Sequence, residues 1–134
     1  MKFFFDNCIA WRLASALAVL LENDGYEIVP LRVKFPANCP DEVWMPALGS
    51  EGGWHVISGD TQIIRNRQRR MVWSASCLTT FFLQPAWMND AITERQKASR
   101  MLARWDEIVA IAVKATPGTA FHLSFKGKIE RAPL

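Results

Sequence analysis

Short apolar runs alternate with segments of helical periodicity along this chain, and that alternation narrows the possible folds more than any other feature. The apolar runs, each typical of a buried strand, are residues 2–5, 26–31, 54–58, 78–83 and 120–125. Helical spacing or helix-start signals mark the intervening segments at 9–23, 41–51, 61–73 and 89–114. Strands separated by helices predict an α/β fold with a mostly parallel sheet.

The linking segments are also readable from the sequence. Two prolines, Pro36 and Pro40, predict a loop over residues 34–40, and Asp41 then begins a helix that ends at Gly52-Gly53. A basic tail follows the last predicted strand. The 134 residues provide for one core, so residues 1–134 are expected to form a single domain.

Composition excludes several classes of protein. Half of the residues are hydrophobic and 22% are charged, which excludes a disordered chain. The three cysteines, Cys8, Cys39 and Cys77, lie far apart with no CxxC pair, so neither a zinc module nor a disulfide framework is expected. Polar residues interrupt the apolar N-terminal region, and a membrane-spanning helix is not expected. Free thiols and the missing span favour a cytoplasmic location.

Three aspartates fall at predicted strand and helix boundaries. Asp6 follows the first strand, Asp60 follows the strand at 54–58 by two residues, and Asp41 opens the preceding helix. A helix of about 15 Å followed by a strand of similar span returns the chain to the edge it left. Asp41, Asp60 and Asp6 are therefore expected at one edge of the sheet. Clustered carboxylates repel one another, and their oxygens suit Mg²⁺ or Mn²⁺.

Each acid also has a purely structural interpretation. Asp41 is well placed as a helix N-cap, and Asp60 follows Gly59 in a turn. Asp6 is equally suited to cap the first helix. Glu42 complements the dipole of the helix that Asp41 begins. The functional interpretation makes Asp6, Asp41 and Asp60 metal ligands and Glu42 a secondary ligand or base.

Positive charge gathers in one segment. The net charge is only +3, from 16 Lys and Arg against 13 Asp and Glu. A few residues beyond Asp60, however, the chain carries Arg65, Arg67, Arg69 and Arg70, and Lys34 lies in the loop before Asp41. These side chains are candidates to bind phosphates, although a solvated helix face is the alternative.

The six tryptophans fall into two groups. Trp44, Trp54 and Trp105 lie on apolar faces and are expected in the core, whereas Trp11, Trp73 and Trp87 are left open as residues that stack on a base.

Three motifs resemble those of PIN-like domains. They are KFFFDNCI at residues 2–9, PDEVW at 40–44 with Ala47 after it, and VISGD at 56–60. The sequence is most similar to the short form found among VapC-type toxins of toxin–antitoxin pairs. The resemblance covers residues 2–84, with weaker agreement through Trp105.

The resemblance implies a three-layer fold and a metal-dependent ribonuclease. The family's first acid matches Asp6, its acid at a helix start matches Asp41, and its acid after the next strand matches Asp60. The family's usual second acid, a glutamate from an intervening helical segment, has no clear counterpart, because the chain between Leu31 and Asp41 is short. Glu42 is the candidate substitute.

The predicted function is an endoribonuclease that hydrolyses RNA phosphodiesters with Mg²⁺ or Mn²⁺. The basic side chains at positions 34, 65, 67, 69 and 70 would contact RNA phosphates. A cognate antitoxin protein and a second copy of the chain are the other partners that the resemblance implies. The alternative is a catalytically degenerate PIN-like module that binds RNA or an antitoxin. A receiver-type domain is disfavoured, because no lysine comes directly after the strand ending at Leu83.

Overall fold

A single six-stranded sheet organises the computed structural model, which describes all residues 1–134. Its strands are β1 (Lys2–Phe5), β2 (Glu27–Pro30), β3 (Trp54–Ser58), β4 (Thr79–Leu83), β5 (Ala120–Leu123) and β6 (Glu130–Arg131). The spatial order is β2-β1-β3-β4-β5-β6, and all pairs are parallel except β5 with β6. The predicted mostly parallel sheet is confirmed. We call the edge where β1 to β5 end the carboxyl edge and the opposite one the amino edge.

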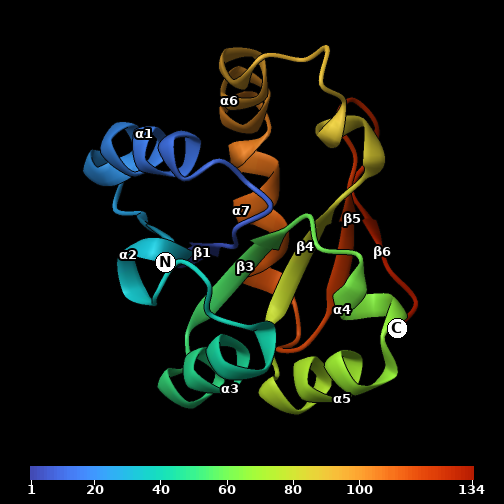
Figure 1. Ribbon diagram of the computed structural model, residues 1–134. Coiled ribbons are helices and arrows are strands. Elements are labelled where there is room, and N and C mark those ends of the chain that lie inside the picture. Colours follow the sequence, from blue (N-terminus) through green and yellow to red (C-terminus); the bar gives the residue numbers. More distant parts are fainter.

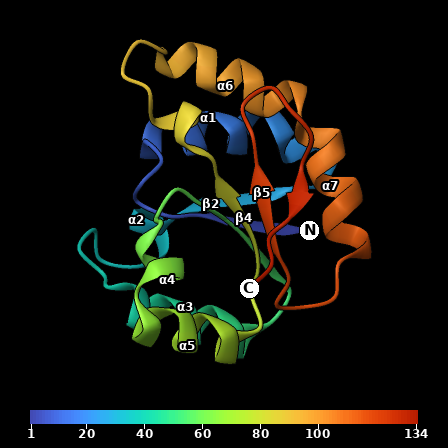
Figure 2. The same cartoon turned by 90° about the vertical axis from the view of Figure 1, so that its right-hand side faces the viewer.

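Helices cover both faces of the sheet (Figures 1 and 2). They are α1 (Trp11–Leu21), α2 (Leu31–Lys34), α3 (Asp41–Glu51), α4 (Gln62–Arg65), α5 (Arg67–Ser76), α6 (Glu94–Ala103) and α7 (Trp105–Lys114), with 3₁₀ turns η1 (Glu22–Asp24) and η2 (Pro85–Met88). Helices α1, α6 and α7 lie on one face, and α3, α4 and α5 lie on the other. This three-layer arrangement confirms the predicted fold class. None of the helices has the length and apolarity needed to cross a membrane.

Strand β1 separates two hydrophobic cores. Phe3 and Phe5 pack with α1, α6 and α7, whereas Phe4 packs with α3 and α5. Successive side chains of a strand point to opposite faces, so a fully apolar run fits a strand that is buried on both sides. All three phenylalanines are fully buried. This places the end of β1, and Asp6 after it, at the carboxyl edge between β2 and β3.

The predicted helix over 89–114 is two helices. A capping box between Thr93 and Gln96 starts α6 at Glu94, so the preceding residues form a turn rather than a helix. Arg104 then interrupts the helical backbone at φ −97° and ψ 0°. Its guanidinium donates to the Ser124 carbonyl and to Glu107, which ties the break to the end of β5.

The basic segment is likewise broken, at Asn66. The backbone there is extended, and the Asn66 side chain accepts from the Arg69 N–H at 3.0 Å, which caps α5. Strand β2 ends at Pro30 rather than Leu31, and Lys34 closes the short helix α2 instead of lying in a loop. The basic tail contains β6, which was not predicted because a two-residue strand carries no periodic pattern.

Candidate active site

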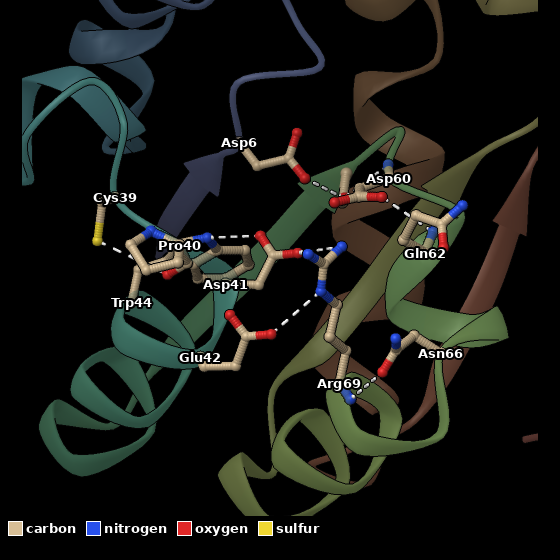
Figure 3. Close-up of polar contacts among 11 residues, drawn as sticks. Asp6, Cys39, Pro40, Asp41, Glu42, Trp44, Asp60, Gln62, Asn66 and Arg69 are labelled. Carbon is tan, nitrogen blue, oxygen red and sulfur yellow. Dashed lines mark hydrogen bonds and ion pairs between the residues drawn. The ribbon is translucent and has the colours of Figure 1, made fainter.

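The three aspartates meet at the carboxyl edge (Figure 3). Asp6 directly follows β1, and Asp60 lies two residues beyond β3, which pairs with β1 in parallel register. Asp41 is the first residue of α3, the helix that leads into β3. Their carboxylates face a common space, and each of Asp6 and Asp41 carries the electrostatic effect of Asp60.

Asp6 is held in place from two sides. Its Oδ1 accepts from the Cys8 N–H at 2.9 Å, and its Oδ2 accepts from the Ser58 hydroxyl. Only 3% of Asp6 is exposed, and burial raises its pKa to about 6, with the negative charge of Asp60 adding to the effect. Asp6 does not cap α1, which begins at Trp11 after Ala10 without a side-chain cap.

Asp41 is oriented by a residue of its own helix. Its Oδ1 accepts from the Trp44 indole N–H at 3.0 Å. Burial, followed by a hydrogen bond with Asp60 and that residue's charge, raises the pKa of Asp41 to about 7. The capping interpretation is wrong, because Pro40 occupies the N-cap position and no side chain caps α3.

Asp60 combines a turn role with a place in the cluster. Its carboxylate accepts from the Gln62 N–H at 2.9 Å, which shapes the turn into α4. Its own N–H donates to Ser58 Oγ at 3.1 Å. The fully buried Ser58 hydroxyl therefore links Asp6 to Asp60. Sequence reasoning did not assign Ser58 a role; a hydroxyl as the last residue of a buried strand was the available signal.

The positively charged guanidinium of Arg69 lies beside the three aspartates. Arg69 Nε lies 3.1 Å from Glu42 Oε1, and Arg69 Nη1 lies 3.9 Å from Asp41 Oδ2. These acids raise the pKa of Arg69, with the Glu42 hydrogen bond the largest cause. Glu42 points to Arg69 rather than into the space between the aspartates. The structure thus brings Asp6, Asp41 and Asp60 together and sets Glu42 apart as the partner of Arg69.

The donor set suits a hard divalent cation by its chemistry. It consists of carboxylate oxygens, which Mg²⁺ and Mn²⁺ prefer, and the charges of Asp6 and Asp41 are destabilised by burial and by neighbouring carboxylates. A cation between them would relieve that destabilisation. In the side-chain positions of this structure, no group of three His, Cys, Asp or Glu side chains has the arrangement of a metal site.

Comparison with known families agrees with this arrangement. A family model described as a PIN like domain matches residues 1–85. The chain belongs to the PIN-like domain family. No curated protein and no solved structure matched the chain. PIN domains are commonly nucleases, which supports a hydrolase of the nuclease type. The matched segment holds all three aspartates, whereas residues 86–134 of this PIN-like domain lie outside it.

In this PIN-like domain, the side chains of Met88 and Cys8 pack around Gly59, next to Asp60. A Cβ atom on Gly59 would lie 2.3 Å from Met88 Cε and 3.2 Å from Cys8 Cβ, so a larger residue between Ser58 and Asp60 would require the Met88 side chain to move. Burial, and then the charge of Asp6, raises the pKa of the Cys8 thiol to about 12. The thiol is therefore neutral at physiological pH and is no nucleophile.

The basic side chains predicted to contact phosphate separate into two locations. Arg65, Arg67 and Arg70 are exposed on α4 and α5, and the Arg69 contacts place the first turn of α5 beside the cluster. Lys34 lies elsewhere. Its Nζ is 2.9 Å from Glu51 Oε2 and 5.5 Å from the Trp54 ring, at the amino edge of the PIN-like domain.

The six tryptophans differ in burial, which decides which of them can stack on a base. Trp44, Trp54 and Trp105 are buried as predicted. Trp73 and Trp87 are 5% and 2% exposed, and their indole N–H groups donate to Thr80 and Leu123, so neither is free to stack on a base. Trp11 is 42% exposed, with the guanidinium of Arg32 5.2 Å from its ring.

Proposed function

We propose that this PIN-like domain is a metal-dependent endoribonuclease that uses Mg²⁺ or Mn²⁺ held by Asp6, Asp41 and Asp60. The observation that carries the proposal is the meeting of these carboxylates at the carboxyl edge, where burial and mutual repulsion raise the pKa values of Asp6 and Asp41. Perturbed acids gathered at a strand-end site are typical of functional centres.

Each proposed ligand has its own support. Cys8 and Ser58 orient Asp6, Trp44 orients Asp41, and the Gln62 N–H orients Asp60. Such partners fix the direction of ligand oxygens before a substrate arrives. When bound, a divalent cation would lower the pKa of water and neutralise phosphate charge.

Arg69 supplies a further positive charge for the phosphate. Its guanidinium lies beside Asp41 and is held there by Glu42. A fixed cation next to the reacting phosphate stabilises the charge that develops on its oxygens. Glu42 then acts by positioning Arg69. The exposed Arg65, Arg67 and Arg70 extend this positive surface along α4 and α5, where the flanking RNA phosphates would bind.

The proposed biological role rests on the resemblance to VapC-type toxins. The protein would be a toxin of a toxin–antitoxin pair, inhibited by a cognate antitoxin in the cytoplasm. The second candidate is a PIN-like module that binds RNA or an antitoxin without cutting. The placement of Glu42 favours it, because the only candidate for the missing acid of the family contacts Arg69 instead of joining the three aspartates.

Incubation of the purified protein with single-stranded RNA, followed by a denaturing gel, tests the proposal. We expect internal cleavage with Mn²⁺ or Mg²⁺ and none with EDTA. Cleavage that persists in EDTA contradicts metal dependence. RNA binding without cleavage under every divalent ion identifies the binding module. Growth arrest on induced expression, relieved by the Asp6→Asn variant, tests the toxin role separately.

A further inference from the structure

A groove of about 920 Å³ lies between α6 and the residues that follow β5. Its walls include Ile92, Arg95 and Arg100 from the α6 region and Phe125 with Lys126 from the β5–β6 connection. Figure 2 shows α6 beside that connection. Residues 86–126 form the whole groove, so it belongs to the part of the chain beyond the matched family segment.

The groove is basic, and its charges have no partners. No acidic residue lines it, and Arg95, Arg100 and Lys126 take part in no ion pair. Other cations in the same region are paired: Lys97 with Glu94 and Arg104 with Glu107. Three like charges around one hollow repel each other, and an anionic ligand would offset that repulsion.

An aromatic ring lies among these charges. The Arg100 guanidinium is 5.0 Å from the centre of the Phe125 ring, which fixes both side chains on the groove wall. Ile92 and Ala86 add apolar surface. A hollow that combines cations with an aromatic ring matches a nucleotide strand, whose phosphates need positive charge and whose bases need an apolar face.

The groove and the aspartates share the carboxyl edge. Phe125 and Lys126 follow the end of β5, and Ala86 follows the end of β4 in the 3₁₀ turn η2. The last residue of η2, Met88, packs its methyl group against Gly59, between Ser58 and Asp60. One short segment of chain therefore packs against Gly59, next to Asp60, at one end and lines the groove at the other.

We propose that this groove binds the sugar-phosphate backbone of the RNA strand next to the cleavage site. The proposal rests on the proposed function and names the path of its substrate: from the aspartates over Met88 and along α6. The groove then holds several nucleotides on the side of the cluster opposite to α5. Residues outside the shared family segment would in this way set how much RNA the enzyme holds.

Binding in EDTA separates this proposal from nuclease activity. The probe is a fluorescein-labelled single-stranded RNA of about 20 nucleotides, compared with one of about four nucleotides. The test variant is Arg95→Gln with Lys126→Gln. The matched control is Lys114→Gln with Arg131→Gln, which removes two exposed cations near the amino edge, at the end of α7 and on β6.

We expect the groove variant to bind the long RNA about fivefold or more weakly. The slope of its salt dependence should fall by about 0.7 for each phosphate that the variant no longer binds. Its affinity for the short RNA and the affinity of the control variant should match the parent. Groove and control variants that bind the long RNA alike overturn the proposal.

The two proposals fail in distinguishable ways. Weakened binding by the groove variant in a protein that never cuts RNA supports the groove and rejects the nuclease. If the parent cleaves RNA and the groove variant binds RNA as tightly as the parent, the nuclease proposal is supported and the groove proposal is rejected.

Discussion

The charged side chains at the two ends of α3 and β3 differ in whether they have stabilising partners. At the amino edge, Glu51 accepts from Lys34 at 2.9 Å and from the Trp54 indole at 3.0 Å, and Lys2 donates to the Gly52 carbonyl at 3.0 Å. Hydrogen bonds to Lys34 and then Trp54 lower the pKa of Glu51. Each of these charged side chains has a polar partner within hydrogen-bond distance.

At the carboxyl edge, the charged forms of Asp41 at the start of α3 and of Asp6 after β1 are disfavoured. Burial and neighbouring carboxylates raise the pKa values of Asp6 and Asp41 to about 6 and 7, respectively. The fold holds these groups in place through Ser58, Cys8 and Trp44. Paired charges at one edge thus contribute to folding, whereas the other edge maintains an unfavourable arrangement that a ligand can relieve.

The largest expected effect is the loss of cleavage on removing a carboxyl-edge charge. Asp6→Asn and Asp60→Asn should each lower metal-dependent RNA cleavage by about 100-fold or more, because each removes a proposed ligand. The metal-free variants should be as stable as the parent or more so, since one repelling charge is gone. Gel assays and thermal unfolding in EDTA measure both quantities.

Glu51→Gln is the matched control at the amino edge. It removes one carboxylate at the opposite end of α3, and we expect unchanged cleavage with a lower melting temperature. Full activity in both aspartate variants contradicts the assignment of the metal ligands.

Asp41 offers the next largest effect. Asp41→Asn keeps an oxygen for the Trp44 indole and removes the charge, so Mn²⁺ affinity should fall about tenfold or more while stability is retained. Asp41→Ser also loses the Trp44 partner and should be less stable by about 1 kcal/mol. Calorimetric titration of the parent and of Asp41→Asn with Mn²⁺ measures this difference in affinity. Parent-like Mn²⁺ affinity of the asparagine variant removes Asp41 from the proposed ligand set.

The pH dependence of stability should reveal the unfavourable edge without any assay of function. The pKa of Asp6 is about 6 in the folded protein against an ordinary value of 3.8, so the folded state binds the proton more tightly than the unfolded state. The resulting stabilisation is complete below pH 3.8 and is lost as pH rises through about 6; for Asp41 the loss extends to about 7. For Asp6 this amounts to on the order of 2–3 kcal/mol.

Urea unfolding in EDTA between about pH 4 and pH 8 measures this loss. Asp6→Asn should lose less stability than the parent over that range, because it carries no titrating group at position 6. Parallel pH profiles for parent and variant would show that Asp6 is not destabilised in the folded protein.

The sequence predicted the features that depend on local pattern. Apolar runs located β1, β3 and β4, and alternation with helices predicted the parallel order that brings the ends of β1 and β3 together. The meeting of Asp6, Asp41 and Asp60 therefore follows from topology alone. The breaks at Asn66 and Arg104 were missed. Asn66 caps α5 locally, a role that asparagine favours, whereas the Arg104 break depends on a contact with Ser124 that forms only in the folded chain.

Roles set by contacts across the fold were equally hidden. Ser58 is important because a neighbouring strand brings Asp6 to its hydroxyl, and Arg69 because α5 packs against α3 beside Glu42. Lys34 shows the converse. It precedes Asp41 closely in sequence, yet α2 carries it to the amino edge, where it pairs with Glu51. Nearness along the chain did not indicate nearness to the site.

The smallest expected effect tests this displacement of Lys34. Lys34→Gln with Lys2→Gln removes two amino-edge cations and should leave RNA affinity unchanged, with a small decrease in melting temperature because Glu51 and the Gly52 carbonyl lose their cationic partners. Arg67→Gln with Arg70→Gln removes two exposed cations beside the cluster and should weaken RNA binding a few-fold and flatten its salt dependence, with no change in melting temperature.

Fluorescence anisotropy at two salt concentrations measures both pairs. Because the two variants change the net charge equally, a difference in affinity reports where the RNA lies rather than how basic the protein is. Equal weakening by the two pairs would mean that RNA contacts both edges, and the division between a folding edge and a functional edge would then fail.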